Sequence, residues 1–377
     1  MNLRDLDTPA LILDRGRLQA NAKAMTDHIA SLGASLRPHM KTAKSVEVAR
    51  IATQGNTGGI TVSTLKEAEY FNAAGMSDIT YAVGLAPGKI GRANALAAAG
   101  ADLTVITDNV ISARFIAQEG RGLNVLIEID CGDRRGGMLA DDEAVIDVAR
   151  LLVASAGVTF RGVLTHAGHS YDCRTPDAMV AMAEHERAVA VAAAGRIVAA
   201  GIACPVVSVG STPTARFARN LEGVTEVRAG VYMFADLFQV GIGSCTPDAM
   251  AISVLATVIG HRPDLGDGKL LIDAGGLSLS KDRSTAALAT DCGYGLLADA
   301  RSGALIPGLV VSGVNQEHGH VTAPGGGTIP YDRLPVGSLV RVYVNHVCMT
   351  AAAYGAYHVI DGEGGDIAQT WQRCNGW

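Results

Sequence analysis

Arg37-Pro38-His39-Met40-Lys41-Thr42 closes the first strong strand signal of the chain. Ser35 and Leu36 end a short extended run, and Pro38 keeps a helix from starting before it, because its ring fixes φ and restricts the residue in front. A lysine just past a strand lies at the mouth of a sheet rather than inside a packed layer. Its amine loses its charge where neighbours desolvate it or repel its proton, which makes Lys41 a candidate Schiff-base nucleophile. Most lysines at strand ends are only solvated, so the rest of the chain decides the assignment.

A repeated motif follows this stretch: a short β-branched run, a turn with Gly, Asp or Ser, and then an Ala-rich helix. After an extended lead-in at 7–14, strands are expected at 34–37, 59–62, 79–83, 103–106, 125–129, 162–165, 206–209 and 226–228. Helices are expected at 15–32, 45–54, 64–74, 88–99, 110–119, 141–156, 175–200 and 213–220. Eight alternating units are what a parallel (β/α)8 barrel needs. An open doubly wound sheet would also alternate, but eight regular units favour closure.

The pattern changes past Gly241. Strand-like runs separated by Gly, Pro and Asp turns are expected at 252–259, 270–273, 303–311, 338–344, 356–360 and 367–371. Long helical periodicity is missing from this part, which is typical of an antiparallel β domain. We therefore expect an α/β fold with a TIM-type barrel over residues 8–241 and a mainly antiparallel β domain over 242–377, with residues 1–7 packing on the second domain.

Composition excludes several classes of protein. With 377 residues, 48% of them hydrophobic and 18% charged, the chain predicts a globular protein with a large core, most simply in two domains. The net charge of −6 argues against a general nucleic-acid binder. We find no membrane-span signal and no signal peptide, so a cytoplasmic location is expected. The seven cysteines are scattered without CxxC pairs, which argues against a disulfide framework.

Barrels of this kind carry their chemistry at the carboxyl ends of the strands. The residues just past the expected strands are polar, small or ionisable: His39, Lys41, Ser63, Thr64, 130–135, His166, His169, 210–212, Gly230 and Tyr232. The 209–214 stretch places a glycine, a hydroxyl pair and backbone N–H groups where a helix begins, in a loop position typical of phosphate sites. Ser211 and Thr212 also fit an ordinary helix cap. Together with Lys41, they make a phosphorylated aldehyde cofactor the economical explanation.

Several of these motifs resemble the fold-type III pyridoxal-phosphate enzymes, within them the D-serine dehydratase and D-threonine aldolase-like family. The resemblance runs from about residue 7 to Trp377 and is carried by 37–42, by 59–64 with Glu67-Ala68-Glu69, by 206–212 and by Gln369-Thr370-Trp371. It is nearest to the 3-hydroxyaspartate dehydratase branch, through 65–69, 165–168 and 315–319.

The resemblance implies an alanine racemase-like barrel whose Lys41 is joined covalently to pyridoxal 5′-phosphate. It also implies that a group of residues surrounds the cofactor, namely His39, Arg135, His166 and Tyr171, and that others hold its phosphate, namely Gly210, Ser211, Thr212, Gly230 and Tyr232. Arg135 would face the pyridine nitrogen. An arginine there keeps that nitrogen unprotonated and weakens the ring as an electron sink. The family further implies a homodimer, with pockets where one barrel mouth meets the partner's β domain.

A second chemical feature lies at the end of the expected 338–344 strand. In extended chain, residues two apart point to one side, so His346 and Cys348 could grip one cation. Imidazole and thiolate suit zinc best, with manganese or cobalt as alternatives. An isolated His-x-Cys is more often no metal site at all. The resemblance reverses that judgement, because the dehydratases carry His-x-Cys here whereas D-threonine aldolases typically carry His-x-Asp.

Four further residues are weaker candidates for substrate contacts. His318 is as much a turn histidine as a ligand, Lys281 and Arg283 are basic residues that would usually be only solvated, and Ser63 follows an expected strand. Residues 88–100 contain glycines but lack the GxGxxG order, so we reject a dinucleotide site.

The sequence thus predicts a pyridoxal-phosphate and divalent-metal dependent dehydratase, an ammonia-lyase for D-serine, D-threonine or 3-hydroxyaspartate. Lys41 would take the α-proton, and the metal would activate the β-hydroxyl. Three alternatives stay open. A D-threonine aldolase would release glycine and an aldehyde, a racemase would need a second base such as Tyr294 or Tyr354, and a non-catalytic pyridoxal-phosphate-binding protein would show no turnover.

Overall fold

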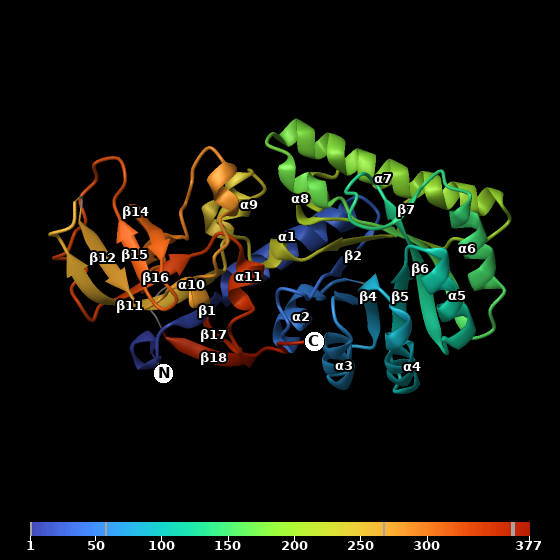
Figure 1. Cartoon of the computed structure of the whole chain (residues 1–377), viewed down its shortest axis with the longest axis horizontal. Helices are drawn as coiled ribbons and strands as arrows, with labels where there is room; N and C mark the ends of the chain where they lie inside the picture. The colour runs from blue at the N-terminus through green and yellow to red at the C-terminus, as the bar shows by residue number, and fades with distance from the viewer. Residues whose placement is uncertain (1, 57–58, 267, 363–365) are drawn as a thin grey trace. The chain divides into compact units, whose positions relative to one another are not determined.

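The computed structural model describes residues 2–56, 59–266, 268–362 and 366–377, which form two compact units (Figure 1). The barrel unit comprises Lys23–Gly230 and the last two residues, and the β unit comprises the chain up to Ala22 together with Val231–Asn375. The division falls at these points rather than at residues 8 and 241, where the sequence had placed it. Helix α1 (Arg15–Ser31) therefore begins in one unit and ends in the other.

A parallel eight-stranded sheet forms the centre of the barrel unit, in the order β2-β10-β9-β8-β6-β5-β4-β3. Its strands are β2 (Ser35–Pro38), β3 (Ile60–Val62), β4 (Asp78–Gly84), β5 (Asp102–Thr107), β6 (Leu123–Asp130), β8 (Val158–Thr165), β9 (Val206–Val209) and β10 (Glu226–Ala229). A parallel bridge between His39 and Thr61 joins the two outer strands, so the sheet closes. The predicted barrel is confirmed, and only the two-residue β7 (Met138–Leu139), which pairs with β6, was not expected.

Helices follow the barrel strands as predicted, with small shifts at their ends. They are α2 (Val46–Ala52), α3 (Leu65–Ala73), α4 (Ile90–Ala98), α5 (Val110–Glu119), α6 (Ala144–Val153), α7 (Pro176–Ala199) and α8 (Thr212–Phe217). Thr64, Asn109 and Thr175 begin α3, α5 and α7, because each side chain accepts a hydrogen bond from a backbone N–H of the first turn. Within the described ranges no helix is both long and apolar enough to span a membrane.

The β unit contains a nine-stranded sheet in the order β12-β15-β14-β13-β16-β11-β1-β17-β18. Its strands are β1 (Ala10–Asp14), β11 (Ile252–Arg262), β12 (Lys269–Ile272), β13 (Leu296–Asp299), β14 (Leu305–Val314), β15 (Gly319–Thr322), β16 (Leu339–Tyr343), β17 (Ala356–Ile360) and β18 (Ile367–Gln372). All pairings are antiparallel except that of β1 with β17.

Three strands of this sheet differ from the expectation. The lead-in at 7–14 contains β1, which pairs with β11 and β17 and so belongs to the β unit. The four-residue strands β13 and β15 were missed, because strands that short show no readable alternation between glycine-containing turns. Short helices lie among the strands: α9 (Leu237–Gly241), α10 (Gly276–Leu279), α11 (Val347–Ala351) and the 3-10 turn η6 (Ser284–Ala287).

Candidate active site

Lys41 lies three residues past β2 and is exposed. The chain before it is tied to both neighbouring strands, since His39 N donates to Ala229 O at 2.7 Å and Met40 N donates to Thr61 O at 2.7 Å. Among the described residues the Lys41 ammonium has no hydrogen bond or ion pair. Lys44, by contrast, is paired at 2.7 Å with the buried carboxylate of Glu67. Lys41 is therefore the lysine of this loop whose amine is available for chemistry.

Two imidazoles near Lys41 are kept neutral. Burial lowers the pKa of His166 to about 3, and the charges of Arg135, Lys41 and Arg228 push it the same way. Burial also lowers the pKa of His39 well below its ordinary value, with Lys41 and Arg228 again contributing. His166 Nδ1 lies 2.8 Å from Gly210 O. A carbonyl only accepts, so Nδ1 carries the proton and Nε2 is left with its lone pair.

These pKa shifts describe a mouth that is suited to an anion. The charges of Lys41, Arg135 and Arg228 all lower the pKa of His166, so three cations lie near this ring. The carboxylates Glu226, Glu186 and Glu128 offset part of the charge of Arg228. A cofactor that carries a phosphate and an aldehyde fits this donor set, because the cations attract the phosphate and an unpaired amine can attack the aldehyde. The described residues thus fit pyridoxal phosphate.

The predicted phosphate residues gather at the carboxyl ends of β9 and β10. Gly210 has φ +130°, and a Cβ there would lie 2.3 Å from Arg228 O, so only glycine fits. Ser211 caps α8 and accepts a hydrogen bond from Thr214 N, so the cap that the sequence also predicted is present. Thr212 is buried beside it. Gly230 follows β10, where a Cβ would lie 2.9 Å from His39 O.

The other predicted cofactor residues differ in how far they are buried. Arg135 has a side chain that is 61% exposed, 3.8 Å from the Asp133 carboxylate. Tyr171 lies half-buried in the 3-10 turn η3 (Gly168–Asp172) after β8. Tyr232 belongs to the β unit and is buried, which raises the pKa of its phenol.

Arg228 was missed by the sequence reasoning. Its buried guanidinium donates to Ser208 Oγ and to Thr165 O, across β9 to β8. It is register-paired with Arg37, which is itself held by Glu226 and Asp78 at 2.7 and 2.8 Å. Interior charges of a barrel need partners of this kind. The alternation of Glu226 and Arg228 in β10 was the signal that could have identified them.

The low pKa of His166 makes a prediction about stability. The folded protein disfavours the charged ring, whereas the unfolded chain takes up the proton near the ordinary histidine pKa of 6.5. Acid therefore destabilises the fold as the pH falls below that value. Between pH 7 and pH 5 the wild type should lose about 2 kcal/mol more than His166→Gln. Urea unfolding of both cofactor-free proteins at the two pH values measures the difference, and equal pH dependence would contradict it.

The predicted metal ligands lie at the start of α11 in the β unit. The expectation of an extended His-x-Cys is wrong, because His346 caps α11 with φ −136° and Cys348 lies inside the helix. The turn is held by Asp236, whose Oδ2 accepts from Val347 N at 3.1 Å. The two side chains nevertheless interact. Burial lowers the pKa of His346, but hydrogen bonds with Asp282 and Cys348 outweigh it and raise it to about 10.

Asp282 orients His346 and was not predicted, although Lys281 and Arg283 on either side of it were. Its Oδ2 lies 3.1 Å from His346 Nδ1, which leaves Nε2 as the ligand atom. Metal-binding histidines commonly have such a carboxylate behind them, and imidazole with thiol suits zinc. Within the described ranges no three His, Cys, Asp or Glu side chains form a complete cluster. Two protein ligands would therefore share the metal with water or substrate.

Removing Asp282 should loosen the metal. With the carboxylate gone, the His346 ring loses the partner that fixes its tautomer, so Asp282→Ala should lower metal affinity by roughly 10- to 100-fold. Competition with a chromogenic chelator measures the affinity. Asp264→Ala is the matched control, since that exposed carboxylate pairs with Arg262. Equal affinities in wild type and Asp282→Ala would contradict the assignment.

The weaker substrate candidates lie in different surroundings. Arg283 forms an ion pair with Asp291 at 2.6 Å, and its guanidinium lies over the Tyr294 ring. Lys281 is exposed, and Ser63 N donates to Glu67 at 3.1 Å.

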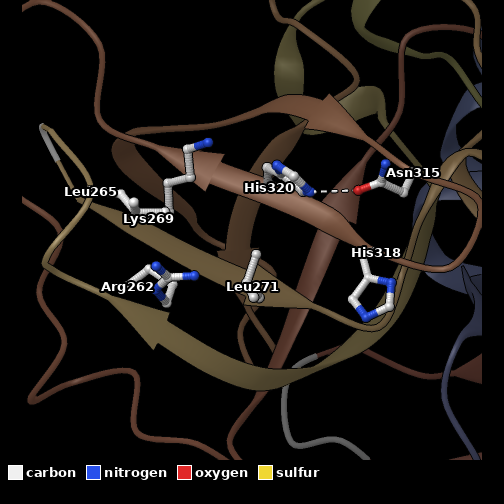
Figure 2. A pocket seen from close by; sticks show the side chains of 7 residues that line it. All are labelled: Arg262, Leu265, Lys269, Leu271, Asn315, His318 and His320. Carbon is white, nitrogen blue, oxygen red and sulfur yellow. Dashed lines mark hydrogen bonds between the residues drawn. The ribbon is translucent and has the colours of Figure 1, made fainter.

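His318 lines a cavity of about 290 Å³ in the β unit (Figure 2). The lining residues are Arg262, Leu265, Lys269, Leu271, Asn315, His318 and His320. Arg262 is paired with Asp264 at 2.8 Å, and burial together with Lys269 and His318 lowers the pKa of His320. The cavity therefore carries less positive charge than its four basic side chains suggest.

Comparison with known proteins adds an independent line of evidence. Residues 13–237 match the alanine racemase N-terminal domain, and residues 251–360 match a serine dehydratase domain. The chain is 47% identical to D-threo-3-hydroxyaspartate dehydratase of Delftia sp. (strain HT23), covering 100% of this chain and 99% of that protein. It is 30% identical to D-serine dehydratase of Dictyostelium discoideum, with coverages of 96% and 95%. It is also 30% identical to D-threonine aldolase of Arthrobacter sp, with coverages of 98% and 93%.

The structure of the Delftia dehydratase superposes with a TM-score of 0.95 at 46% identity, covering 100% of both chains. Related structures of D-threo-3-hydroxyaspartate dehydratase include a histidine-to-alanine variant and a cysteine-to-alanine variant two positions further on, the latter in a metal-free form. The spacing of those two positions equals that of His346 and Cys348 in this chain.

Proposed function

This chain belongs to the alanine racemase-like family of pyridoxal-phosphate enzymes, and from that premise we propose that it is a metal-dependent dehydratase of D-configured 3-hydroxy amino acids. The substrate loses its α-proton and β-hydroxyl, and the products are a 2-oxo acid and ammonia. D-threo-3-hydroxyaspartate is the first substrate to test, because the 47% identical relative is named for it. The choice of dehydration over aldol cleavage rests on that relative and on Cys348, at a position where the resemblance gives D-threonine aldolases an aspartate.

The barrel mouth supplies the cofactor half of the proposal. Pyridoxal phosphate, when bound, supplies an aldehyde for covalent attachment and a conjugated ring that accepts electron density from the α-carbon. Lys41 would hold the cofactor through its aldehyde, and the same amine, when free, would take the α-proton of the substrate. The 210–212 loop and Gly230 would hold the phosphate, while His39, Tyr171 and Tyr232 would enclose the group. His166 would present the Nε2 lone pair that its hydrogen bond to Gly210 leaves open.

Arg135 has a particular role in the proposal. Facing the pyridine nitrogen, its guanidinium would donate and never release its proton. The ring would then accept less electron density, so departure of the hydroxyl would need more help from the second half of the site.

His346 and Cys348 supply that half. A divalent metal, when bound, supplies a Lewis acid that makes hydroxide a better leaving group. Zinc suits the imidazole and thiolate best, with manganese and cobalt as alternatives. His346 would offer Nε2 because Asp282 occupies Nδ1, and Asp236 would hold the backbone between the two ligands. Ser63, Lys281, Arg283 and His318 stay proposals as substrate contacts.

One observation weakens the racemase alternative. Tyr354 donates its hydroxyl to Ser278 O at 3.0 Å, and burial raises the pKa of the phenol. A tyrosine that serves as a second base needs the opposite shift. The observation applies to Tyr354 alone, because the Arg283 guanidinium lies 5.1 Å from the ring centroid of Tyr294 and that contact leaves the hydroxyl of Tyr294 out of account.

A product assay tests the proposed function. The protein is supplied with D-serine, D-threonine and D-threo-3-hydroxyaspartate, and 2-oxo acid is measured against glycine with aldehyde. We expect 2-oxo acid with equimolar ammonia. Glycine and aldehyde as the main products would establish the aldolase instead, and the absence of any turnover would favour a cofactor-binding protein. We further propose that the protein is cytoplasmic and that it forms a homodimer. A solution mass of twice 38.9 kDa would support the dimer.

A further inference from the structure

Helix α7 carries one polar exception on its buried side. Its other buried residues are Met179, Ala183, Ala190, Ala193, Ala194 and Ile197, whereas Glu186 is buried to 1% exposure among them. Packing of a helix against a barrel does not need a carboxylate, and burying one is costly unless hydrogen bonds satisfy it. The partners of Glu186 therefore indicate what the side chain does.

Those partners include two backbone N–H groups from neighbouring loops. Glu186 Oε1 accepts from Ala167 N at 2.7 Å and from Gly210 N at 3.0 Å. Ala167 follows β8 and Gly210 follows β9, so one oxygen ties the two loops together. Burial raises the pKa of Glu186, while hydrogen bonds with the Thr214 hydroxyl and with the two N–H groups, and then the charge of Arg228, oppose this shift.

The peptide at Gly210 is held from both sides. Its N–H donates to Glu186, and its carbonyl accepts from His166 Nδ1 at 2.8 Å. With φ at +130°, this residue aims the chain that continues into Ser211 and Thr212. Releasing the N–H would free the start of the loop and remove the fixed acceptor that sets the His166 tautomer.

We propose that Glu186 is a positioning residue for the cofactor phosphate, which acts by fixing the 210–212 loop through Gly210. The inference rests on the proposed function, because the phosphate belongs to the proposed cofactor. Glu186 itself does not need to touch the cofactor. If Glu186 has this role, replacing it should weaken binding of the cofactor's phosphate and leave the other contacts of the cofactor unchanged.

The test compares two ligands that differ only in the phosphate. Dissociation constants of pyridoxal phosphate and of pyridoxal are measured by absorbance titration of the cofactor-free full-length protein. Glu186→Ala leaves two buried N–H groups without an acceptor, so we expect pyridoxal-phosphate affinity to fall at least about tenfold while pyridoxal affinity changes less than about threefold. Glu186→Gln keeps an acceptor oxygen and should stay within about threefold of wild type for both ligands.

The matched control lies on the same helix. Glu184 is exposed and paired with Arg187 at 2.6 Å, so Glu184→Ala should bind both ligands as wild type does. If circular dichroism shows that Glu186→Ala does not fold, Glu186→Asp replaces it in the test. Its carboxylate is one methylene too short to reach both N–H groups, so the same loss of pyridoxal-phosphate affinity is expected.

Three results would overturn the inference: unchanged pyridoxal-phosphate affinity in the Ala or Asp variant, an equal loss for both ligands, or a Gln variant as weak as the Ala variant. A wild type that binds pyridoxal phosphate no better than pyridoxal would instead contradict the cofactor assignment. The two failures are therefore distinguishable.

Discussion

Lys41→Ala should abolish dehydration, lowering turnover by at least about a thousandfold, because no other side chain would both hold the cofactor and take the α-proton. The variant should also lose the visible absorbance band that a cofactor attached covalently to Lys41 would give. Steady-state release of 2-oxo acid and a visible spectrum of the purified protein measure the two effects. Tight but non-covalent retention of cofactor, with no band, would agree with the assignment.

Lys89→Ala is the control for this experiment. Lys89 is another exposed lysine that follows a barrel strand, and its amine lies 3.4 Å from the Tyr81 hydroxyl. We expect full activity and an unchanged spectrum. If Lys41→Ala kept both the band and comparable turnover, another amine would have to be the nucleophile, and the reading of the 37–42 stretch would be wrong.

His346→Ala and Cys348→Ala should each remove the metal and lower dehydration by roughly a thousandfold, since leaving-group activation supplies several kcal/mol of the barrier. Both variants should keep the cofactor spectrum, because the barrel unit holds Lys41 and the phosphate loop without them. Metal content by elemental analysis and 2-oxo acid formation are the measurements.

Cys245→Ala serves as the control, since Cys245 is another cysteine of the β unit that forms no disulfide. It should change neither metal content nor rate. Loss of metal with retained dehydration in the His346 or Cys348 variant would separate the metal from the reaction and favour a mechanism driven by the cofactor alone.

The barrel could be predicted from the sequence because each of its units repeats one local pattern. All eight strands ended close to the expected residues. The residues that follow β2, β8, β9 and β10 were predicted to line the barrel mouth because they are polar, small or ionisable. The β unit was harder to predict. Strands β13 and β15 have four residues each, and β1 joins a sheet whose other strands follow more than two hundred residues later.

The supporting side chains could not be predicted, because tertiary contacts alone define them. Asp282 acts on His346 across 64 positions of sequence, and Glu186 acts on Gly210 across 24. The local geometry of Cys348 was misjudged for a related reason. The residues 338–348 carry no signal that a helix begins there, because the helix start depends on Val347 N donating to the distant, buried Asp236.

The central claim is that an amine past the first barrel strand and a metal on His346 and Cys348 serve one elimination. The most direct measurement is 2-oxo acid formation from D-threo-3-hydroxyaspartate by protein whose metal has been removed exhaustively, followed by stepwise return of Zn²⁺, Mn²⁺ or Co²⁺. The account predicts that activity vanishes while the cofactor spectrum persists, and that it returns as metal approaches one ion per chain. Full 2-oxo acid formation by the metal-stripped protein would contradict it.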